Sequence, residues 1–555
     1  MSKITYERVK EFLERFPRIQ IGGRPVSQSI SYNGLSYYDL IPSIISATTI
    51  DLVRYINADG DSREFYFQQL PTSIKTQIKY GDPSAFLFII IRIGRDIYES
   101  IRTAITYRRE ASKNRSGQPD PASGKKIIMV VSQSMYWKPD QNGYFRQYPL
   151  GEVLVALSKT YEIIGIETPY RFDERSKNRL QFKEMQWFMQ SEFIGISDIA
   201  KALLYTFFAI PKYSLLFWKV NRASVNEDAV FRSLFELSKF EIIRYCFSAL
   251  FTFILYHSAN KNLLRKKSPL AALVLYETGP FEKIFIRACR EERVKTVGIM
   301  HGIIHPYHLD YNRKYVDIEA AMIPDCTFVW GEYANRVLTE MSNYPRSSVT
   351  VTGNLAPSKK KNGQPYVPPK ESIGRKTVGV ISTSYPYSEL TEEKAYLYHK
   401  DLYEYATVNE SVELIIKLHP GEPITIHNRL RKEYPSGRIQ VHRNMDSAMF
   451  FESSDIIVGI TYSTMLYDAL RWKKEIICLS YDNDFEYADF FLDSNSILLI
   501  TDNHQVGLTI DAVLFHGKRI FRDHDAEIFL QDHVGQRDIN SCNVALLKML
   551  NMVSS

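Results

Sequence analysis

The sequence predicts an α/β protein with two doubly wound parallel-sheet domains. Three observations support this fold class. Short apolar runs alternate with stretches of helical spacing, the alternation occurs twice, and a joint rich in Pro and Lys at 357–370 separates the two series. Buried parallel strands are nearly continuous apolar runs. A chain of 555 residues also exceeds the roughly 250–300 residues that one core usually holds. We therefore expect two parallel sheets facing a cleft.

The first series extends from 124 to 356 and follows a segment rich in Pro, Gly and Ser at 111–124. Its apolar runs end in small polar or turn-forming residues, which is typical of strands that lead into loops. A helical insertion at about 180–265 interrupts the series, and a helical region at 1–110 precedes it. The expected strands lie within 125–134, 161–169, 269–279 and 294–306, and two further strand-to-helix or strand-to-loop units lie within 326–341 and 347–357.

The second series extends from 371 to 515 and has the same alternation of apolar runs and helical stretches. Beyond it, 516–555 is expected to be a helical segment that returns across the joint between the domains. The expected strands lie within 375–384, 413–420, 438–442, 454–460, 475–480 and 496–500.

Composition narrows the possible classes of function. A hydrophobic content of 45% and a charged content of 24% are ordinary for a soluble globular protein. The net charge of +6 is compatible with anionic substrates or surfaces and too small to indicate nucleic-acid binding. Five scattered cysteines without a CxxC motif predict buried reduced thiols. The first 17 residues have an amphipathic helical pattern and do not resemble a signal peptide, so we expect a cytoplasmic protein.

Three apolar segments, 84–97, 199–220 and 245–258, are each too short or too interrupted to predict a membrane-spanning helix. Two interpretations remain open for them. They are core helices of a large domain, or they form a helical surface that enters a membrane with Lys and Arg facing anionic headgroups. The second interpretation makes the protein peripheral at the inner face of the cell membrane.

Polar residues follow two strands of the second domain. His419 and Pro420 end one strand, and Lys417 lies on the same face two residues earlier. Tyr462, Ser463 and Thr464 end another strand directly before a helix. Ligands of open α/β sheets bind outside the carboxyl ends of the strands, so we expect these residues to bind a phosphate-containing donor. Alternatively, Ser463 and Thr464 only cap the helix, and the side chain of Lys417 only extends past the end of the strand to solvent.

The first domain should supply acceptor binding and a general base. His301 ends one strand and is the base that we prefer, and Glu277 ends another strand and is its rival. Gly302 permits a tight turn against a ligand, and His305 and Gly143 are expected to line the path of the acceptor. No cluster of carboxylates or Cys accompanies the histidines, so we expect no metal.

Four short motifs occur in a characteristic order. They are His301-Gly302, Thr352-Gly353-Asn354, His419-Pro420 and Tyr462-Ser463-Thr464. In this order and at these strand ends, the chain from Lys125 onward resembles the two-Rossmann-domain (GT-B) glycosyltransferases. Within that group it is similar to teichoic-acid glycerophosphotransferases and capsule sialyl- and Kdo-transferases. It departs from the glycerophosphotransferase pattern at Thr461, where that pattern has an acidic residue, and it lacks the Pro and Lys that follow the His-Gly pair.

The resemblance implies transfer of a sugar from a nucleotide-activated donor to a cell-surface glycan or lipid-linked acceptor. The nucleotide sugar is then a co-substrate, and no cofactor is expected. A CDP-glycerol-type polyol-phosphate transferase is the nearest alternative, and a nucleotide-sugar 2-epimerase ranks third. A non-catalytic membrane-associated scaffold of polysaccharide assembly is the alternative from a different class.

Overall fold

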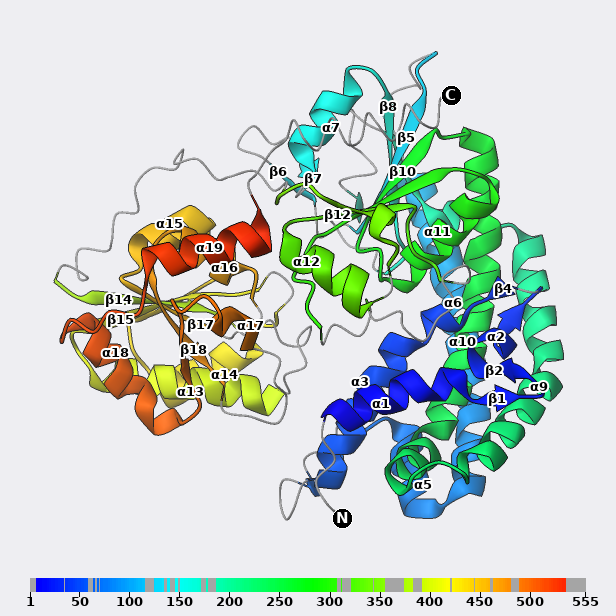
Figure 1. Cartoon of the computed structure of the whole chain (residues 1–555), viewed down its shortest axis with the longest axis horizontal. Helices are drawn as coiled ribbons and strands as arrows, with labels where there is room; N and C mark the ends of the chain where they lie inside the picture. The colour runs from blue at the N-terminus through cyan, green and yellow to red at the C-terminus, as the bar shows by residue number, and fades with distance from the viewer. Residues whose placement is uncertain are drawn as a thin grey trace. The chain divides into compact units, whose positions relative to one another are not determined.

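A computed structural model shows two compact units, 1–357 with 537–555 and 358–536 (Figure 1). Each unit is described by itself. The structure describes residues 6–33, 35–57, 63–64, 67–68, 70–114, 124–133, 137–139, 145–147, 150–170, 176–177, 186–306, 311, 321–342, 344–354, 374–382, 392–419, 422–443, 445–459, 463–480 and 489–535.

The first unit contains a seven-stranded sheet in which all strands are parallel. Its apolar strands are buried on both faces, and helices α7 (Gly151–Ser158) and α11 (Pro280–Glu291) follow two of them. The strands in spatial order are β13 (Val349–Val351), β12 (Cys326–Val329), β11 (Lys295–Ile299), β10 (Ala271–Leu275), β5 (Ile127–Ser132), β8 (Glu162–Glu167) and β9 (Gln186–Met189). β5, the first strand of this sheet along the chain, is thus an inner strand, and the order reverses between β5 and β10.

The second unit contains a six-stranded parallel sheet with the same winding. Its strands in spatial order are β16 (Ile439–His442), β15 (Val412–Lys417), β14 (Lys376–Ile381), β17 (Ile456–Gly459), β18 (Glu475–Leu479) and β19 (Leu498–Ile500). The order reverses between β14 and β17. The connecting helices are α13 (Glu392–Val408), α14 (Thr425–Glu433), α15 (Ser447–Ser453), α16 (Met465–Arg471), α17 (Asp489–Leu492) and α18 (Val506–Leu514).

These two sheets confirm the predicted fold class of two Rossmann-like parallel sheets. Every predicted strand is present, with shifts of a few residues at the ends. In these two sheets one strand was missed, because β9 lies inside the segment that we assigned to a helical insertion. The short hairpins β1–β2 at 20–25, β3–β4 at 31–36 and β6–β7, which pairs 137–139 with 145–147, were not predicted either. The predicted arrangement of the two sheets around a cleft stays a prediction.

The N-terminal region is helical, as expected, and belongs to the first unit. Its helices are α1 (Tyr6–Arg15), α2 (Val26–Ser29), α3 (Pro42–Asn57), α5 (Thr72–Tyr80) and α6 (Asp82–Asn114), and β1–β2 and β3–β4 form two short hairpins at 20–25 and 31–36. Buried Asp39 connects this region to the sheet. Its carboxylate accepts the backbone N–H of Met322 at 2.9 Å, and its backbone carbonyl accepts from Lys283 of α11 at 2.8 Å.

The insertion consists mainly of two long antiparallel helices, α9 (Ile196–Ser224) and α10 (Ala229–Lys267). Both are long and apolar enough, by length and composition, to cross a membrane. They differ in burial. In its most apolar stretch α10 is 61% buried, because α3, α6, α9 and α11 pack around it, whereas α9 is only 28% buried. The segment 245–258 is therefore core, and 199–220 is not.

The C-terminal helix α19 (Asp523–Val534) packs against α16 of the second unit. Tyr467 of α16 contacts His533 of α19, with its hydroxyl 3.2 Å from the ring nitrogen Nδ1. The residues after 535 lie outside the described residues, so the predicted return of 516–555 across the joint stays a prediction.

Candidate functional site

His419 lies in the loop that follows β15, at the carboxyl edge of the second sheet, and its side chain is exposed. The preceding residue, Leu418, is buried and still bonded to β16 through the carbonyl of His442 at 2.9 Å. The chain therefore leaves the sheet at the imidazole. Lys417 is half-buried, and its ammonium donates to the carbonyl of Met445 at 2.6 Å. That contact favours an anchoring role for Lys417 in the sheet over the predicted donor-binding role.

Ser463 and Thr464 follow β17 on the same edge of the sheet. The hydroxyl of Ser463 accepts the backbone N–H of Met465 at 3.3 Å, and Thr464 is exposed. Strands β15 and β17 are separated only by β14, which corresponds to roughly 10 Å between their ends. The point where the strand order reverses, between β14 and β17, is where doubly wound sheets bind ligands. Ser463 and Thr464 lie at that point, and His419 lies one strand away.

The loop of His419 is closed by Glu422, a buried residue that the sequence reasoning missed. The carboxylate of Glu422 accepts the backbone N–H of His419 at 3.3 Å, and the backbone N–H of Glu422 donates to the carbonyl of His419 at 3.0 Å. The hydroxyl of Ser382, at the end of β14, donates to the same carboxylate at 2.6 Å. Glu422 therefore connects the end of the central strand to the His419 turn.

Two buried histidines surround this carboxylate. His399 of α13 lies 3.0 Å from the Ser382 hydroxyl and 3.9 Å from Glu422, and His427 of α14 lies 3.9 Å from Glu422. Burial lowers the pKa of His399 to about 3, so its ring is neutral at neutral pH. Burial alone would raise the pKa of Glu422, but the nearby histidines and the hydroxyl of Ser382 hold it below its usual value. An ionised carboxylate is thus kept in the core by surrounding donors.

The same three side chains are a possible metal-ligand set. Among the described residues, His399, Glu422 and His427 form the one group of His, Cys, Asp and Glu that could hold an ion, with ligand atoms within 4.8 Å of one another. The sequence analysis did not anticipate this group. Because Ser382 bridges His399 and Glu422, and Tyr403 lies 3.2 Å from Nδ1 of His427, we interpret it as a hydrogen-bond network.

Replacing Glu422 with Ala should destabilise the second unit by roughly 2–4 kcal/mol. The change leaves the hydroxyl of Ser382 and the N–H of His419 without their acceptor in a buried setting. Urea denaturation followed by fluorescence measures the loss, and Glu422→Gln, which keeps an acceptor oxygen, should lose less. Glu410→Ala, at an exposed carboxylate of the same unit, is the control. Equal stability of the Glu422 and Glu410 variants would show that the network contributes nothing.

In the first unit His301 and Glu277 both follow strands at the carboxyl edge. β10 and β11 pair in parallel with Leu275 opposite Ile299, so each residue comes two positions after the last pair. His301 is half-buried, and its ring stands edge-on to that of Tyr276 at 5.1 Å. Tyr276 has a positive φ of 59°, which marks a sharp turn directly after β10.

Glu277 is turned inward from that edge. Its carboxyl group is 1% exposed and lies 3.4 Å from the hydroxyls of Thr327 and Tyr344. It fits only because β11 has a glycine beside it: a Cβ on Gly298 would lie 1.4 Å from the carboxyl oxygen. Burial raises the pKa of Glu277 to about 8. The group is therefore protonated at neutral pH and cannot accept a proton there, which favours His301 over Glu277 as the base.

A second buried carboxyl, Glu282, lies at the reversal point of the first sheet, and the sequence reasoning missed it. It is in the first turn of α11, directly after β10, and the hydroxyl of Tyr170 donates to it at 2.9 Å. Thr168 and Gln133, which follow β8 and β5, also lie close to it. Burial raises the pKa of Glu282 to about 7. A signal was available in the sequence, because an acid three residues after Gly279 lies in the first turn of the helix.

Five other predicted site residues can be placed only in part. Gly302 and His305 are half-buried in the loop after β11, and their acceptor role stays a prediction. Pro420, Tyr462 and Gly143 lie outside the described residues. Each unit thus has a carboxyl edge with a histidine and a buried acid.

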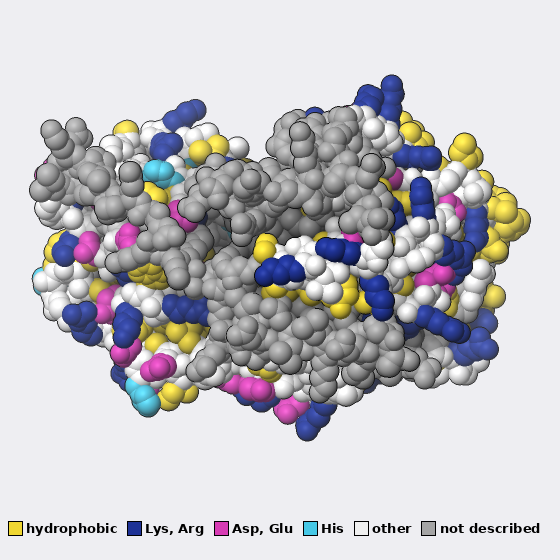
Figure 2. Space-filling view, turned by 90° about the horizontal axis from the view of Figure 1, so that it is seen from above, with side chains coloured by type: hydrophobic (Ala, Val, Ile, Leu, Met, Phe, Trp, Pro, Cys, Tyr) yellow, Lys and Arg dark blue, Asp and Glu magenta, His cyan; other side chains and the backbone are white. Residues whose placement is uncertain are grey.

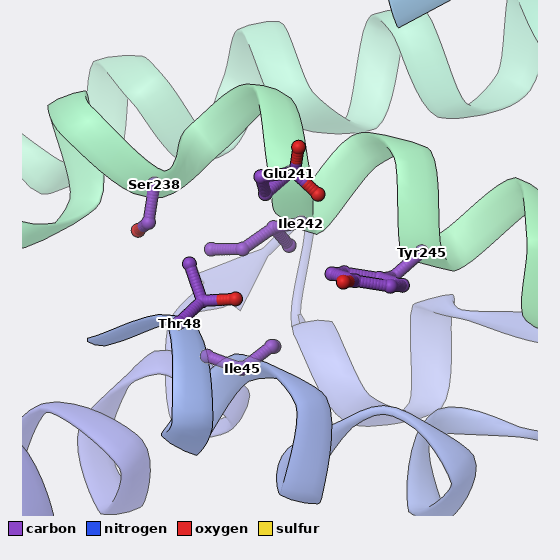
Figure 3. Close-up of a pocket in the computed structure, with 6 residues that line it drawn as sticks. All are labelled: Ile45, Thr48, Ser238, Glu241, Ile242 and Tyr245. Carbon is purple, nitrogen blue, oxygen red and sulfur yellow. The ribbon is translucent and has the colours of Figure 1, made fainter. Parts of the chain in front are cut away.

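A pocket elsewhere in the first unit has no comparable chemistry. It lies between α3 and α10 and is too narrow for a water molecule, and Figure 3 shows its lining residues, which are Ile45, Thr48, Ser238, Glu241, Ile242 and Tyr245. The carboxylate of Glu241 is already bound by the hydroxyl of Ser73 and by Arg244 at 2.9 Å. We assign no ligand to this pocket.

Comparison with known sequences is sparse. No protein-family model matches the chain. One curated relative, the uncharacterized protein MJ1060 of Methanocaldococcus jannaschii, is 23% identical over 210 residues. The match covers 37% of this chain and 33% of the relative, so the chain spans about a third of that protein's length.

Comparison with solved structures gives distant similarities over most of the chain. The S. aureus MnaA–UDP co-structure is 12% identical with a TM-score of 0.47, covering 78% of this chain and 98% of that one. The glycosyltransferase SnogD from Streptomyces nogalater is 13% identical with a TM-score of 0.47, covering 77% and 100%. The UDP-GlcNAc 2-epimerase from Neisseria meningitidis bound to UDP-GlcNAc is 10% identical with a TM-score of 0.44, covering 77% and 100%. The similarity concerns the fold, and the assignments below rest on the residues described above.

Proposed function

We propose that this protein is a glycosyltransferase that passes a sugar from a nucleotide-activated donor to a cell-surface glycan or lipid-linked acceptor. The observation that carries the proposal is the exposed imidazole of His419. It stands at the carboxyl edge of a doubly wound sheet, on a turn held by buried Glu422, one strand away from the reversal point. A ligand group presented from a rigid turn beside a switch point suits phosphate binding better than a structural role.

In the proposed reaction the second unit holds the donor. His419 donates to a phosphate oxygen, and the hydroxyls of Ser463 and Thr464 donate to the same diphosphate. When the bond between the sugar carbon and the phosphate oxygen breaks, the nucleoside diphosphate leaves with the electron pair. The donors already in place stabilise the charge that grows on the leaving oxygen.

The first unit binds the acceptor and supplies the base. The acceptor hydroxyl forms the new bond to the sugar carbon and loses its proton to His301, because Glu277 is already protonated at neutral pH. Both carboxyl edges have to meet at a shared cleft for this step, and that arrangement stays a prediction. We propose a glycan or lipid-linked acceptor because we also propose that the first unit contacts a membrane.

Incubation with CDP-glycerol and with a set of nucleotide sugars, each with and without acceptor glycans or lipids, tests the proposal by product analysis. Glycosyltransfer requires acceptor-dependent release of a nucleotide from a nucleotide sugar. Turnover of CDP-glycerol alone would replace it with polyol-phosphate transfer. Conversion of a nucleotide sugar without any acceptor would indicate an epimerase, and no turnover with any donor would favour the scaffold.

Replacing Ser463 and Thr464 together with Ala should weaken nucleotide binding roughly tenfold, because two hydroxyl donors to the diphosphate are removed. Thr464 is exposed and Ser463 is half-buried, so the melting temperature should change little. Isothermal titration with the best nucleotide measures the affinity. The matched control is Ser447→Ala together with Thr425→Ala, on other helices of the same unit. Unchanged affinity in the Ser463 and Thr464 variant would remove these residues from the site.

A further inference from the structure

Helix α9 presents an apolar face to solvent along its middle. The side that packs against α10 is a regular stripe of buried residues, namely Ala202, Thr206, Ala209, Tyr213, Leu216, Phe217, Val220 and Ser224. The opposite side is also apolar, which is unusual for a helix on the surface of a globular unit. Its large exposed residues are Leu203, Leu204, Tyr205, Phe207, Phe208, Ile210, Leu215 and Trp218.

The exposure at the centre of this face is large. Phe207 is 68% exposed and Phe208 is 66% exposed, and their rings contact each other at 5.9 Å. At the right-hand end of Figure 2, on the side where α9 lies in Figure 1, hydrophobic side chains reach the outline of the molecule with Lys and Arg beside them. Contiguous apolar surface of this kind marks a binding surface in soluble proteins.

Beyond its first turn, which contains Asp198, α9 has charges of one sign. From 199 to 226 there is no acidic residue, and the basic residues are Lys201, Lys212, Lys219 and Arg222. The ammonium of Lys212 is used within the protein, where it donates to the carbonyl of Ser31 at 3.0 Å. Lys201, Lys219 and Arg222 are exposed at the two ends of the apolar face. An apolar face with basic ends complements a surface that is apolar inside and anionic at its boundary.

Aromatic residues with a polar atom stand near the two ends of this face. Tyr205 packs edge-on against Tyr32 at 4.9 Å, and the guanidinium of Arg222 lies 4.4 Å over the ring of Trp218. Tyr and Trp are enriched where hydrocarbon meets headgroups, because their rings are apolar and their tips are polar. The basic charge and the aromatic ends of the apolar face together favour a lipid surface over a protein partner.

We propose that α9 lies in the surface of an anionic lipid bilayer and anchors the first unit there as a peripheral contact. The helix does not cross the bilayer. Ile196 is also exposed, but the charged residues Asp198 and Lys201 separate it from the rest of the face. The continuous exposed apolar face extends over 16 residues, from Leu203 to Trp218, or roughly 24 Å, which is shorter than a hydrocarbon core of about 30 Å. The other face of α9 is buried within the first unit, with α10 as its main neighbour. This inference goes beyond the proposed activity and does not rest on it.

Co-sedimentation of the full chain with vesicles tests the proposal. Vesicles of phosphatidylcholine with phosphatidylglycerol should bind the protein, and pure phosphatidylcholine should bind it several-fold less, with the difference shrinking in high salt. Phe207→Ser with Phe208→Ser should lower partitioning into the anionic vesicles at least about tenfold. Lys201→Gln with Lys219→Gln should reduce only the part of the binding that depends on charge.

The control is Val408→Ser with Leu508→Ser, two residues of the second unit that are 76% and 72% exposed. It should bind vesicles like the wild type. The proposal fails if the wild type does not sediment with anionic vesicles, or if the Phe207 and Phe208 variant sediments equally well. It also fails if light scattering shows a dimer that this variant dissociates, because a second copy then covers the face. The rise in melting temperature with nucleotide, measured on the same variants, tests the proposed activity separately.

Discussion

Replacing His419 with Ala should reduce sugar transfer at least about 100-fold and leave the fold intact. The imidazole is exposed at the end of β15, so its removal opens no cavity in the core. The loss should appear in the turnover number as well as in donor affinity, because the proton donor stabilises the leaving phosphate most strongly in the transition state. Steady-state kinetics with the donor found by the product assay measure both quantities.

His504→Ala is the matched control for this prediction, since His504 is an exposed histidine elsewhere in the same unit. Its kinetics should equal those of the wild type. Activity of the His419 variant within a few-fold of the wild type would exclude His419 from the reaction. A His419 variant with a lowered melting temperature would instead assign the residue a structural role in the turn.

Replacing Glu277 with Gln should make the protein more stable at alkaline pH relative to the wild type. The folded-state pKa of about 8 exceeds the ordinary value of 4.5, so the unfolded chain loses its proton first as the pH rises. The unfolded state therefore binds fewer protons between these pH values, and the free energy of unfolding falls as pH rises through that window. A Gln has no proton to lose, so the variant avoids this fall.

The difference in unfolding free energy, variant minus wild type, should grow by roughly 4 kcal/mol between pH 5 and pH 9. Urea denaturation at each pH measures it. Glu340→Gln, at an exposed carboxylate of the same unit, should show no such trend. A constant difference for Glu277→Gln across the same range would mean that the carboxyl is ionised in the folded protein, and Glu277 would return as a candidate base.

The two sheets could be predicted from the sequence because their strands are apolar on both faces. Runs such as Ala271–Leu275 and Val412–Lys417 can hardly form anything but buried strands between turn-forming residues. β9 was missed because Gln186–Met189 is short and stands next to two long helices, and the helical pattern dominates that window. The order of the strands in each sheet became known only from the structure, because no local sequence pattern encodes which strands pair.

The sequence predicted which residues of the candidate site follow a strand, but it did not predict where their side chains point. A residue after a parallel strand must lie at the carboxyl edge, and His301, Glu277, His419 and Ser463 do so. Whether a side chain then points outward or into the core depends on the turn. Tyr276, with its positive φ, precedes the buried Glu277, whereas His419 remains exposed.

Glu422 shows the limit of motif reasoning most clearly. It comes three residues after His419, in the same Gly-containing loop, and an exposed acid would have been the ordinary expectation. Only the fold brings Ser382, His399 and His427 around it from three other elements. The apolar face of α9 was partly visible in the sequence, but which of its two apolar sides packs on α10 required the structure.

The most direct test of the central claim is a melting-temperature screen of the full chain against nucleotides and nucleotide sugars, run in parallel on the His419→Ala variant. A ligand that binds only the folded state raises the melting temperature in proportion to its saturation. We expect at least one nucleoside diphosphate or its sugar to give a rise of roughly 5 °C at a hundredfold excess over Kd, with little or no rise in the variant. No rise with any nucleotide, or an equal rise in both proteins, would contradict it.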